Sequence, residues 1–405
     1  MSLFPTKPTV AVIGGGPAGL MAAEKLAGAG CSVTVCDRMP SVGRKFLMAG
    51  RGGLNLTHSE SLTAFKGRYG TAVKRLAPAI ESFPPADLIK WCEGLGQETF
   101  VGSSGRVFPK SLKASPLLRA WLRRLESLGV EFSMKQNWRG WDAQGRLLFD
   151  GGAVVSADAI VLALGGASWP RLGSDGAWTE ILKKQGVKMS PLRPANCGFV
   201  APWSDIFAER FAGEPLKPIN LSFGDVVLQG EAMVTRAGLE GGAIYALSAF
   251  LRDAIEKKGS AVLTIDLRPG LSQDDIAQRL QAPRGSQSGS NYLRKKTGLP
   301  PVAIGLMRES IGGANLPTEP EELAALIKQT EIKLTGASPI TRAISSAGGV
   351  AWDELDKNYM LTKRPGVFVC GEMLDWEAPT GGYLLQGCFS TAAAAAQGVR
   401  DYLVS

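Results

Sequence analysis

The stretch that decides the fold is TVAVIGGGPAG at Thr9–Gly19, together with CSVTVCD at Cys31–Asp37. Residues 9–13 are apolar and largely β-branched, which predicts a buried strand, and residues 20–29 are rich in Ala and Leu, which predicts a helix. Residues 31–36 predict a second strand. Strand, glycine turn, helix and strand within about 30 residues is the unit that builds parallel sheets. We therefore predict an α/β fold with a Rossmann-like dinucleotide-binding domain.

The glycine turn carries the pattern Gly14-x-Gly16-x-x-Gly19. In such a turn the first glycine permits the tight bend, the second lets the backbone approach a pyrophosphate, and the third allows close packing of helix and strand. Pro17 suits the first helical turn, where its missing N–H is not needed. With Ala18 beside it, the free N–H groups at the helix start favour an anion. The predicted ligand here is the pyrophosphate of a dinucleotide.

Asp37 ends the second strand, 18 residues after Gly19, and Arg38 follows it. A carboxylate in this place accepts hydrogen bonds from ribose hydroxyls, and it repels a 2′-phosphate. We predict that Asp37 and Arg38 belong to the adenosine end of the site and that NADP is disfavoured there. A surface acid at a strand end is the alternative.

Residues 40–58 are rich in Gly and Arg and show no clear periodicity, so we expect a long loop. Cations and small residues lie together in it, immediately after the acid that is expected to bind ribose. They would neutralise phosphate and lie over the cofactor, although a solvated basic loop has the same composition. The cofactor-binding residues predicted in this loop are Arg44, Lys45, Gly50, Arg51, Gly52, Gly53 and Asn55.

Two further apolar strands end in glycine. Residues 158–164 run into Gly165-Gly166, and residues 366–370 run into Gly371-Glu372. A strand that meets glycine and an acid is typical of a backbone that passes close to a cofactor, and a simple strand-end turn is the alternative for the first of them. Next come Gly381, Gly382 and Tyr383, all three predicted to lie near the cofactor, and an Ala-rich helix at 391–397.

The order of these segments predicts a split domain. We expect an N-terminal part of the FAD-binding domain at 1–190 and its C-terminal part at 335–405. Prolines punctuate short strand-like segments between them, which predicts an inserted β-rich subdomain at 191–270. A helical pattern then predicts an inserted helical subdomain at 271–334.

Composition narrows the chemistry. A single histidine, His58, leaves no His-rich metal site, and six cysteines without a C-x-x-C pair argue against a dithiol centre or a zinc knuckle. We predict no metal. Free thiols fit a reducing compartment, and with no signal peptide and no apolar stretch long enough to span a membrane we predict a cytoplasmic protein without membrane contact.

The net charge of +8 admits an anionic partner. The basic residues are scattered, however, and the densest runs, Arg119-Arg123-Arg124 and Arg294-Lys295-Lys296, are short. We interpret both as solvated helix faces, and we expect no nucleic-acid partner. The sequence indicates no oligomeric state.

Five motifs together resemble the BaiN-like NAD(P)/FAD-dependent oxidoreductases, within the two-dinucleotide-binding flavoproteins. They are VAVIGGGPAGL at 10–20, GRKFLMAGRGGLNLTHSE at 43–60, GRVFPKSLKAS at 105–115, ALGGASWPRLGSDG at 163–176 and CGEMLDWEAPTGGYLLQG at 370–387. The resemblance implies one FAD. It places Arg44-Lys45 and residues 50–55 over the flavin, and Gly371-Glu372 with Gly381-Gly382 on the ribityl and isoalloxazine side. The family often has a cysteine in the 50–55 loop, and this chain has none.

The resulting hypothesis is an FAD-dependent oxidoreductase that reduces a small organic acceptor through flavin N5. NAD(P)H is the expected donor, bound transiently because a second glycine fingerprint is absent. A flavin enzyme that acts on RNA and a non-catalytic flavoprotein redox sensor are the alternatives. No catalytic residue is assigned; His58, Tyr383 and Glu372 are candidates, and each is expected more often to be structural or cofactor-binding.

Overall fold

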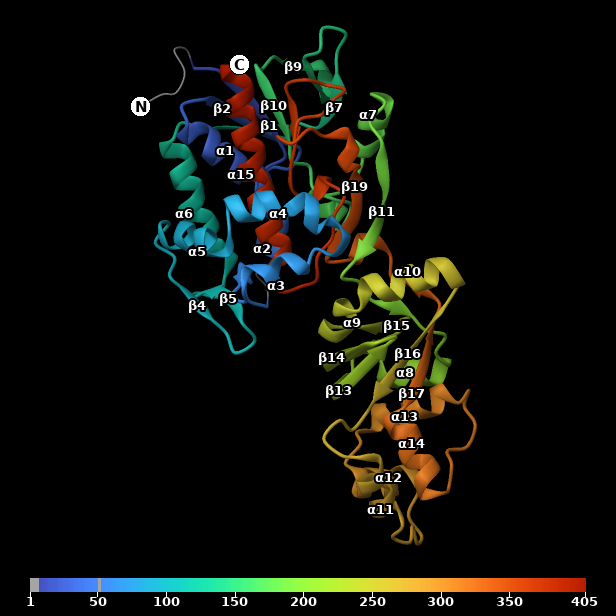
Figure 1. Cartoon of the computed structure of the whole chain (residues 1–405). Coiled ribbons are helices and arrows are strands. Elements are labelled where there is room, and N and C mark those ends of the chain that lie inside the picture. Colours follow the sequence, from blue (N-terminus) through green and yellow to red (C-terminus); the bar gives the residue numbers. More distant parts are fainter. Residues whose placement is uncertain (1–6, 50–51) are drawn as a thin grey trace. The chain divides into compact units, whose positions relative to one another are not determined.

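The structure is a computed structural model that describes residues 7–49 and 52–405 (Figure 1). Contacts divide the chain into two compact units. Unit 1 consists of the residues up to Pro194 together with Ile340–Ser405, and unit 2 is Ala195–Pro339. One unit is therefore inserted into the other. The finer division of the insertion into a β-rich and a helical range stays a prediction.

Unit 1 is organised around a five-stranded parallel sheet in the order β20-β10-β1-β2-β6. Its strands are β1 (Thr9–Ile13), β2 (Ser32–Asp37), β6 (Glu131–Met134), β10 (Ala159–Leu162) and β20 (Val367–Val369). The inner strand β10 and the edge strand β20 are buried along their whole length, as expected for a parallel sheet with both faces covered. The predicted α/β fold with a parallel sheet is confirmed.

Helices cover this sheet, and α1 (Pro17–Gly28) packs along α15 (Tyr383–Val404) (Figure 1). A cluster of aromatic rings joins the surrounding helices: Trp121 on α6 contacts Trp91 on α5 and Phe389 on α15. The other helices of unit 1 are α2 (Arg44–Ala49), α3 (Leu62–Gly67), α4 (Val73–Ser82), α5 (Pro85–Glu93), α6 (Ala114–Ser127) and α7 (Trp178–Lys184). Helices from both ends of the chain therefore share one core.

Several local predictions for unit 1 were wrong. The expected loop at 40–58 contains the six-residue helix α2 and the short strand β3 (Thr57–His58). In the sequence, Gly145 and Gly151-Gly152 predict a small antiparallel set of strands at 130–155, but β6 at its start pairs with β2 in the parallel sheet. The smaller antiparallel sheets are β3 with β5 (Arg106–Pro109) and β4 (Thr99–Val101), and β7 (Trp138–Trp141) with β8 (Leu147–Phe149) and β9 (Val154–Val155). In addition, β11 (Met189–Ala195) pairs with β19 (Ser345–Val350).

Unit 2 contains a seven-stranded antiparallel sheet in the order β17-β16-β13-β14-β15-β12-β18. The strands are β12 (Phe199–Val200), β13 (Pro215–Phe223), β14 (Val226–Thr235), β15 (Gly238–Glu240), β16 (Ala261–Asp266), β17 (Thr330–Leu334) and β18 (Gly336–Ala337). The helices are α8 (Asp205–Phe211), α9 (Gly242–Ala246), α10 (Ser248–Lys258), α11 (Gln273–Leu280), α12 (Gly289–Thr297), α13 (Pro301–Ser310) and α14 (Pro320–Lys328). The strand β17 follows the helices α11–α14 and pairs with β16, so the helical range ends in a strand of this sheet.

The last helix is much longer than the predicted 391–397, because α15 runs for 22 residues from Tyr383 to Val404. The sequence at 71–95 predicts a helical region, and the structure divides it into two helices, since α4 ends at Ser82 and α5 begins at Pro85. Within residues 7–49 and 52–405, no helix has both the length and the apolar character needed to cross a bilayer.

Candidate functional site

The glycine turn between β1 and α1 opens onto a cavity, and its three fingerprint glycines differ in what surrounds them. Gly14 has φ +106°, and a Cβ there would overlap the carbonyl oxygen of Ala163 at the end of β10. A Cβ on Gly19 would overlap the carbonyl oxygen of Gly14. Gly16 has ordinary extended angles, and no described atom lies within 4 Å of where its Cβ would be. The protein's own packing therefore requires glycine at 14 and 19, whereas at 16 the space faces the cavity.

The start of α1 offers unpaired backbone donors to that cavity. Its N-cap residue is Gly16, no side chain caps it, and the first turn contains no acidic residue. The N–H groups of a helix's first turn have no partner within the helix, and the helix dipole adds positive potential there. The end of this 12-residue helix thus forms an anion-binding position.

Asp37 is fixed at the carboxyl end of β2 by two backbone N–H groups. Its Oδ2 accepts a hydrogen bond from Gly15 N at 2.7 Å, and its Oδ1 accepts one from Met39 N at 2.7 Å. Burial raises the pKa of the Asp37 carboxyl above its usual range, and the two backbone hydrogen bonds oppose that effect. Since a carboxylate has about four lone-pair positions, the anchored group retains acceptor capacity for a ligand.

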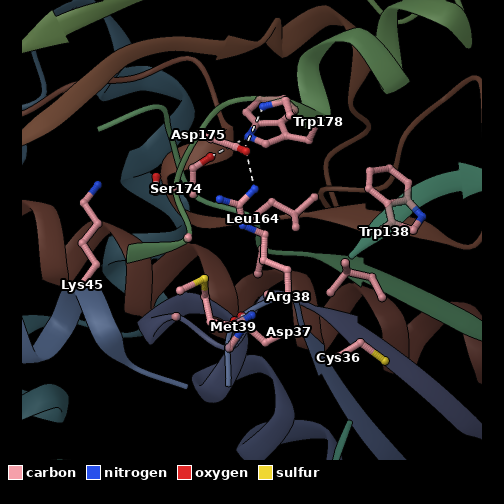
Figure 2. A pocket seen from close by; sticks show the side chains of 18 of the residues that line it. Cys36, Asp37, Arg38, Met39, Lys45, Trp138, Leu164, Ser174, Asp175 and Trp178 are labelled. Atoms are coloured by element: carbon pink, nitrogen blue, oxygen red, sulfur yellow. Dashed lines mark hydrogen bonds and ion pairs between the residues drawn. The ribbon is translucent and has the colours of Figure 1, made fainter. Parts of the chain in front are cut away.

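The cavity itself has a volume of about 410 Å³ and belongs to unit 1 (Figure 2). Ten of the residues predicted from the sequence line it: Gly14, Gly16, Pro17, Ala18, Asp37, Arg38, Arg44, Lys45, Gly165 and Glu372. Nine other predicted residues do not line it: Gly19, Gly52, Gly53, Asn55, Gly166, Gly371, Gly381, Gly382 and Tyr383. Gly50 and Arg51, also predicted, lie outside the described residues. The structure thus gathers the turn, the acid after β2 and the acid after β20 around one cavity.

Sequence reasoning missed several lining residues. Trp138 and Arg139 come from β7, and Asp175 and Trp178 come from the segment before and within α7. Asp175 falls within the 163–176 motif, so a signal for it existed. For β7 no signal existed, because its residues suggested only an antiparallel strand. Cys388 on α15 also lines the cavity.

An ion pair between two charged side chains lies on the cavity wall at one end. The guanidinium of Arg38 forms an ion pair with Asp175, and its Nη2 donates to the carbonyl oxygen of Pro170 at 3.1 Å (Figure 2). Both side chains are about one-third exposed, at 28% and 32%. The pair connects the end of β2 with the 163–176 motif and closes this end of the cavity.

Three buried polar atoms on the cavity wall have no hydrogen-bond partner among the described residues. They are Arg44 Nε, Trp138 Nε1 and Ser174 Oγ. Most buried polar groups in proteins are hydrogen-bonded, so these three atoms are available to a polar ligand in the cavity. The two N–H donors, the serine hydroxyl and the start of α1 suit a ligand that carries phosphates, sugar hydroxyls and an aromatic base. The residues present therefore fit a dinucleotide.

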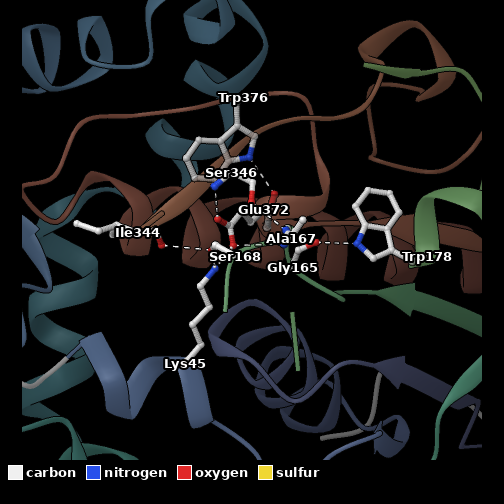
Figure 3. A network of polar contacts seen from close by, with 11 residues as sticks. Lys45, Gly165, Ala167, Ser168, Trp178, Ile344, Ser346, Glu372 and Trp376 are labelled. Atoms are coloured by element: carbon white, nitrogen blue, oxygen red, sulfur yellow. Dashed lines mark hydrogen bonds and ion pairs between the residues drawn. The ribbon is translucent and has the colours of Figure 1, made fainter. Parts of the chain in front are cut away.

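At the other end of the cavity, a polar network is centred on Glu372 (Figure 3). Lys45 Nζ donates to Glu372 Oε2 at 2.8 Å and to Ser168 Oγ at 2.6 Å. Ser346 N donates to Glu372 Oε1 at 2.9 Å, and Gly166 N donates to Oε2 at 3.3 Å. The network joins α2, the end of β10, β19 and the end of β20, so residues far apart in sequence hold one carboxylate in place.

The surroundings of the cavity-lining cysteines Cys370 and Cys388 disfavour a thiolate. Burial, with Glu372 nearby, raises the pKa of Cys388 to about 12. Its neighbour Cys370 is fully buried, and burial also raises the pKa of that thiol. Burial therefore favours the protonated thiol at both positions over the nucleophilic thiolate that covalent catalysis requires.

Tyr383 and His58 lie together away from this cavity, in a cluster that holds the start of α15. Tyr383 Oη donates to Glu60 Oε1 at 2.5 Å, and Arg68 Nη2 donates to Glu60 Oε2 at 2.7 Å. The His58 ring stacks on Tyr383 with centroids 5.6 Å apart. Burial and the Glu60 carboxylate raise the pKa of Tyr383. These contacts give Tyr383 a structural role, that of fixing the N-terminus of α15.

The glycine that immediately precedes α15 packs against β3. Gly382 has φ +94°, and a Cβ there would lie 2.5 Å from Thr57 Cα on β3. Thr57 Oγ1 in turn donates to Gln386 Oε1 at 2.8 Å inside the protein. Contact with β3 thus explains Gly382, whereas at Gly381, which has φ +136°, a Cβ would lie 2.6 Å from the Tyr383 ring.

Comparison with known proteins extends these observations. A family model described as the HI0933-like protein Rossmann domain matches residues 8–398. A 3-dehydro-bile acid delta(4,6)-reductase of Clostridium scindens is 24% identical over 399 residues, covering 94% of this chain and 96% of that protein. A ribosomal RNA dihydrouridine synthase of Escherichia coli is also 24% identical, covering 95% of this chain and 96% of the synthase.

Solved structures share the fold at lower identity. The open conformation of a flavocytochrome c3 fumarate reductase aligns with a TM-score of 0.52 at 15% identity, over 99% of this chain and 79% of that one. A 3-ketosteroid delta1-dehydrogenase from Sterolibacterium denitrificans aligns with a TM-score of 0.52 at 13% identity, over 98% and 100%. These likenesses concern the fold.

Proposed function

Because the chain belongs to the HI0933-like Rossmann-domain family, we propose that this flavin-dependent oxidoreductase holds FAD in the cavity of unit 1 and reduces a small organic acceptor. The observation that carries the proposal is Gly16. Its missing side chain serves no contact among the described residues, and it lies where the free N–H groups of α1 face a cavity of about 410 Å³. Such a position suits the pyrophosphate of a dinucleotide.

The remaining wall residues would hold the rest of the cofactor. Asp37, anchored by two backbone N–H groups, would accept hydrogen bonds from the adenosine ribose. Arg44, whose Nε is buried without a partner among the described residues, would neutralise phosphate charge. Glu372 would accept a ribityl hydroxyl, since the network around it already fixes the orientation of its carboxylate.

The flavin supplies hydride acceptance and donation at N5, and this chain's residues bind, orient and shield it. The loop at residues 52–55 and the start of α15 do not line this cavity, and they would border the isoalloxazine where the flavin extends beyond it, as the family resemblance implies. The positive end of the 22-residue helix α15 favours negative charge nearby. NAD(P)H is the proposed donor, bound transiently.

The acceptor class follows from what the two curated relatives share. A 3-dehydro delta(4,6) bile acid has C=C bonds conjugated to a carbonyl, and forming dihydrouridine saturates a C=C bond conjugated to a carbonyl. We propose that this chain, too, adds a hydride to the β-carbon of such a conjugated C=C bond and a proton to the α-carbon.

A small molecule is favoured over RNA as the acceptor. Acidic and basic residues are nearly equal in number in unit 2, so the net charge of +8 arises in unit 1, where the proposed pyrophosphate site lies. An insertion without excess positive charge lacks the electrostatic attraction to phosphates that dominates RNA affinity. RNA reduction nevertheless stays the second candidate, because the Escherichia coli relative carries that name.

The test starts with the purified full chain. We expect visible flavin absorption that NADH or NADPH bleaches without oxygen, and that cyclohex-2-enone restores while its saturated analogue cyclohexanone does not. A uridine-containing RNA transcript is tested in parallel for formation of dihydrouridine. A colourless protein that takes up no added FAD would refute the proposal, and reoxidation by the RNA but not by the enone would favour the second candidate.

A further inference from the structure

Unit 2 has a cavity of its own, of about 240 Å³, formed by three helices. One wall comes from α8, a second from α12, and a third from α13, and Figure 1 labels all three in the inserted unit. The run Arg294-Lys295-Lys296, expected from the sequence to be a solvated helix face, lies on α12. Arg294 lines the cavity.

The inner surface of this cavity is apolar and aromatic. Phe207, Phe211 and Ile304 line it and are 3%, 9% and 3% exposed. Gly305 on α13 lets the rings approach, because a Cβ there would lie 2.6 Å from Phe211 and 3.0 Å from Phe207. Ile206 also lines the cavity and is 79% exposed, which is unusual for a large apolar residue.

Three guanidinium groups line the same cavity, one from each helix: Arg210, Arg294 and Arg308. Within the described residues none of them forms an ion pair with a carboxylate; Arg308 Nη2 donates only to Ser290 Oγ, at 3.2 Å. The one carboxylate in the lining is Glu309, which accepts from the backbone N–H and the hydroxyl of Ser204 at 2.8 and 2.7 Å. The positive charge of the cavity is therefore not neutralised by its own walls.

From this combination we propose that the cavity of unit 2 binds a small amphipathic anion, in which a carboxylate or a phosphate monoester is attached to an apolar body. Guanidinium groups recognise either head group by paired hydrogen bonds. The phenylalanine rings and the exposed Ile206 would cover the apolar body. The size of the cavity suits a ligand of one aromatic ring rather than a polymer.

Calorimetric titration of the full chain tests this with two probes, phenyl phosphate and phenylacetate. We expect the preferred probe to bind at least about ten-fold more tightly than inorganic phosphate or benzyl alcohol, because each of these lacks one half of the ligand. The tighter of the two probes identifies the head group. Saturating FAD is present throughout, so that a probe competing for the site in unit 1 is excluded.

Matched variants locate the binding. The double variant R294Q/R308Q should weaken the preferred probe at least about ten-fold, since it removes two charged donors. K295Q removes the same kind of charge from the exposed face of the same helix, outside the lining, and should change the affinity by less than about two-fold. Absence of binding, equal loss in K295Q, or an unchanged affinity in R294Q/R308Q would overturn the proposal. A loss of binding in R294Q/R308Q that K295Q does not show locates the probe in unit 2 whether or not FAD binds unit 1.

Discussion

The substitution Gly16→Ala separates a ligand-binding role from a folding role. The backbone at Gly16 has φ −80° and ψ −179°, which any residue adopts, and no described atom lies within 4 Å of the added Cβ. A Gly→Ala change at a compatible position gains about 0.4–1 kcal/mol from the unfolded state, and alanine at an N-cap loses a similar amount. We therefore expect the free energy of unfolding of the FAD-free protein to stay within about 1 kcal/mol of the parent.

The effect on the cofactor should be far larger. The added methyl would stand between the pyrophosphate and the N–H groups that begin α1, and the loss of two hydrogen bonds to a charged acceptor is worth about 1.5–3 kcal/mol each. The total of about 3–6 kcal/mol corresponds to a Kd for FAD about 10² to 10⁴ times higher. The purified variant should be colourless or weakly yellow.

Flavin fluorescence titration measures that Kd, and thermal unfolding without FAD measures the stability. The matched control is Gly28→Ala, at the last residue of the same helix, where the Cβ also meets nothing within 4 Å and the residue is exposed. It should bind FAD like the parent. Undiminished FAD affinity in Gly16→Ala, or a melting temperature well below that of Gly28→Ala, would show that the space at Gly16 has another purpose.

Three further predictions concern stability. Gly382→Ala should lower the free energy of unfolding by about 2–4 kcal/mol in urea, because φ is +94° and the new Cβ would lie 2.5 Å from the backbone of β3. The hydrogen bond from Arg68 is the main cause that lowers the pKa of Glu60 in the folded protein. The carboxylate therefore stabilises the folded state at pH values above its unfolded-state pKa of about 4.3. This stabilisation is lost as the pH falls through the lower pKa of the folded state. Glu60→Gln should accordingly lower the free energy of unfolding by about 1–2 kcal/mol at neutral pH and leave it nearly unchanged in acid. Urea unfolding at both pH values measures this, and an equal loss at both would contradict it. A double-mutant cycle of Lys45→Met with Glu372→Gln should give a coupling of about 1 kcal/mol, and additive effects would mean that the ion pair contributes nothing.

The sequence predicted the structure best where residues close together in the chain determine the local fold. The run from Thr9 to Asp37 predicted a strand, a turn, a helix and a strand, and the structure has β1, α1 and β2 there. The match of the family model over residues 8–398 confirms the resemblance drawn from five motifs. Both successes rest on short-range patterns, in which residue order already determines which groups are neighbours.

One group of failures has a physical cause in glycine, which has more than one use. Gly387 and Gly398 made α15 appear short, yet both lie within it. A Cβ on Gly387 would lie 2.7 Å from the Trp376 ring, and one on Gly398 would lie 3.0 Å from Asn358 Cβ. These glycines let other segments approach the helix, and only the tertiary partners reveal that. Similarly, nothing local to Gly382 announces its contact with β3.

The same ambiguity explains why the candidate site could be predicted in part. Lys45 and Glu372 are 327 positions apart, so their pairing is invisible in a single sequence, although each was selected from its own motif. Among the described glycines that line the cavity, Gly14, Gly15, Gly43, Gly165 and Gly173 all have protein atoms within 4 Å of the place where a Cβ would be, and Gly16 alone has none. Packing accounts for the absence of a side chain at the others. At Gly16 no such contact exists, and the proposed pyrophosphate would account for the glycine, which makes this residue the strongest link between the sequence pattern and the proposed cofactor.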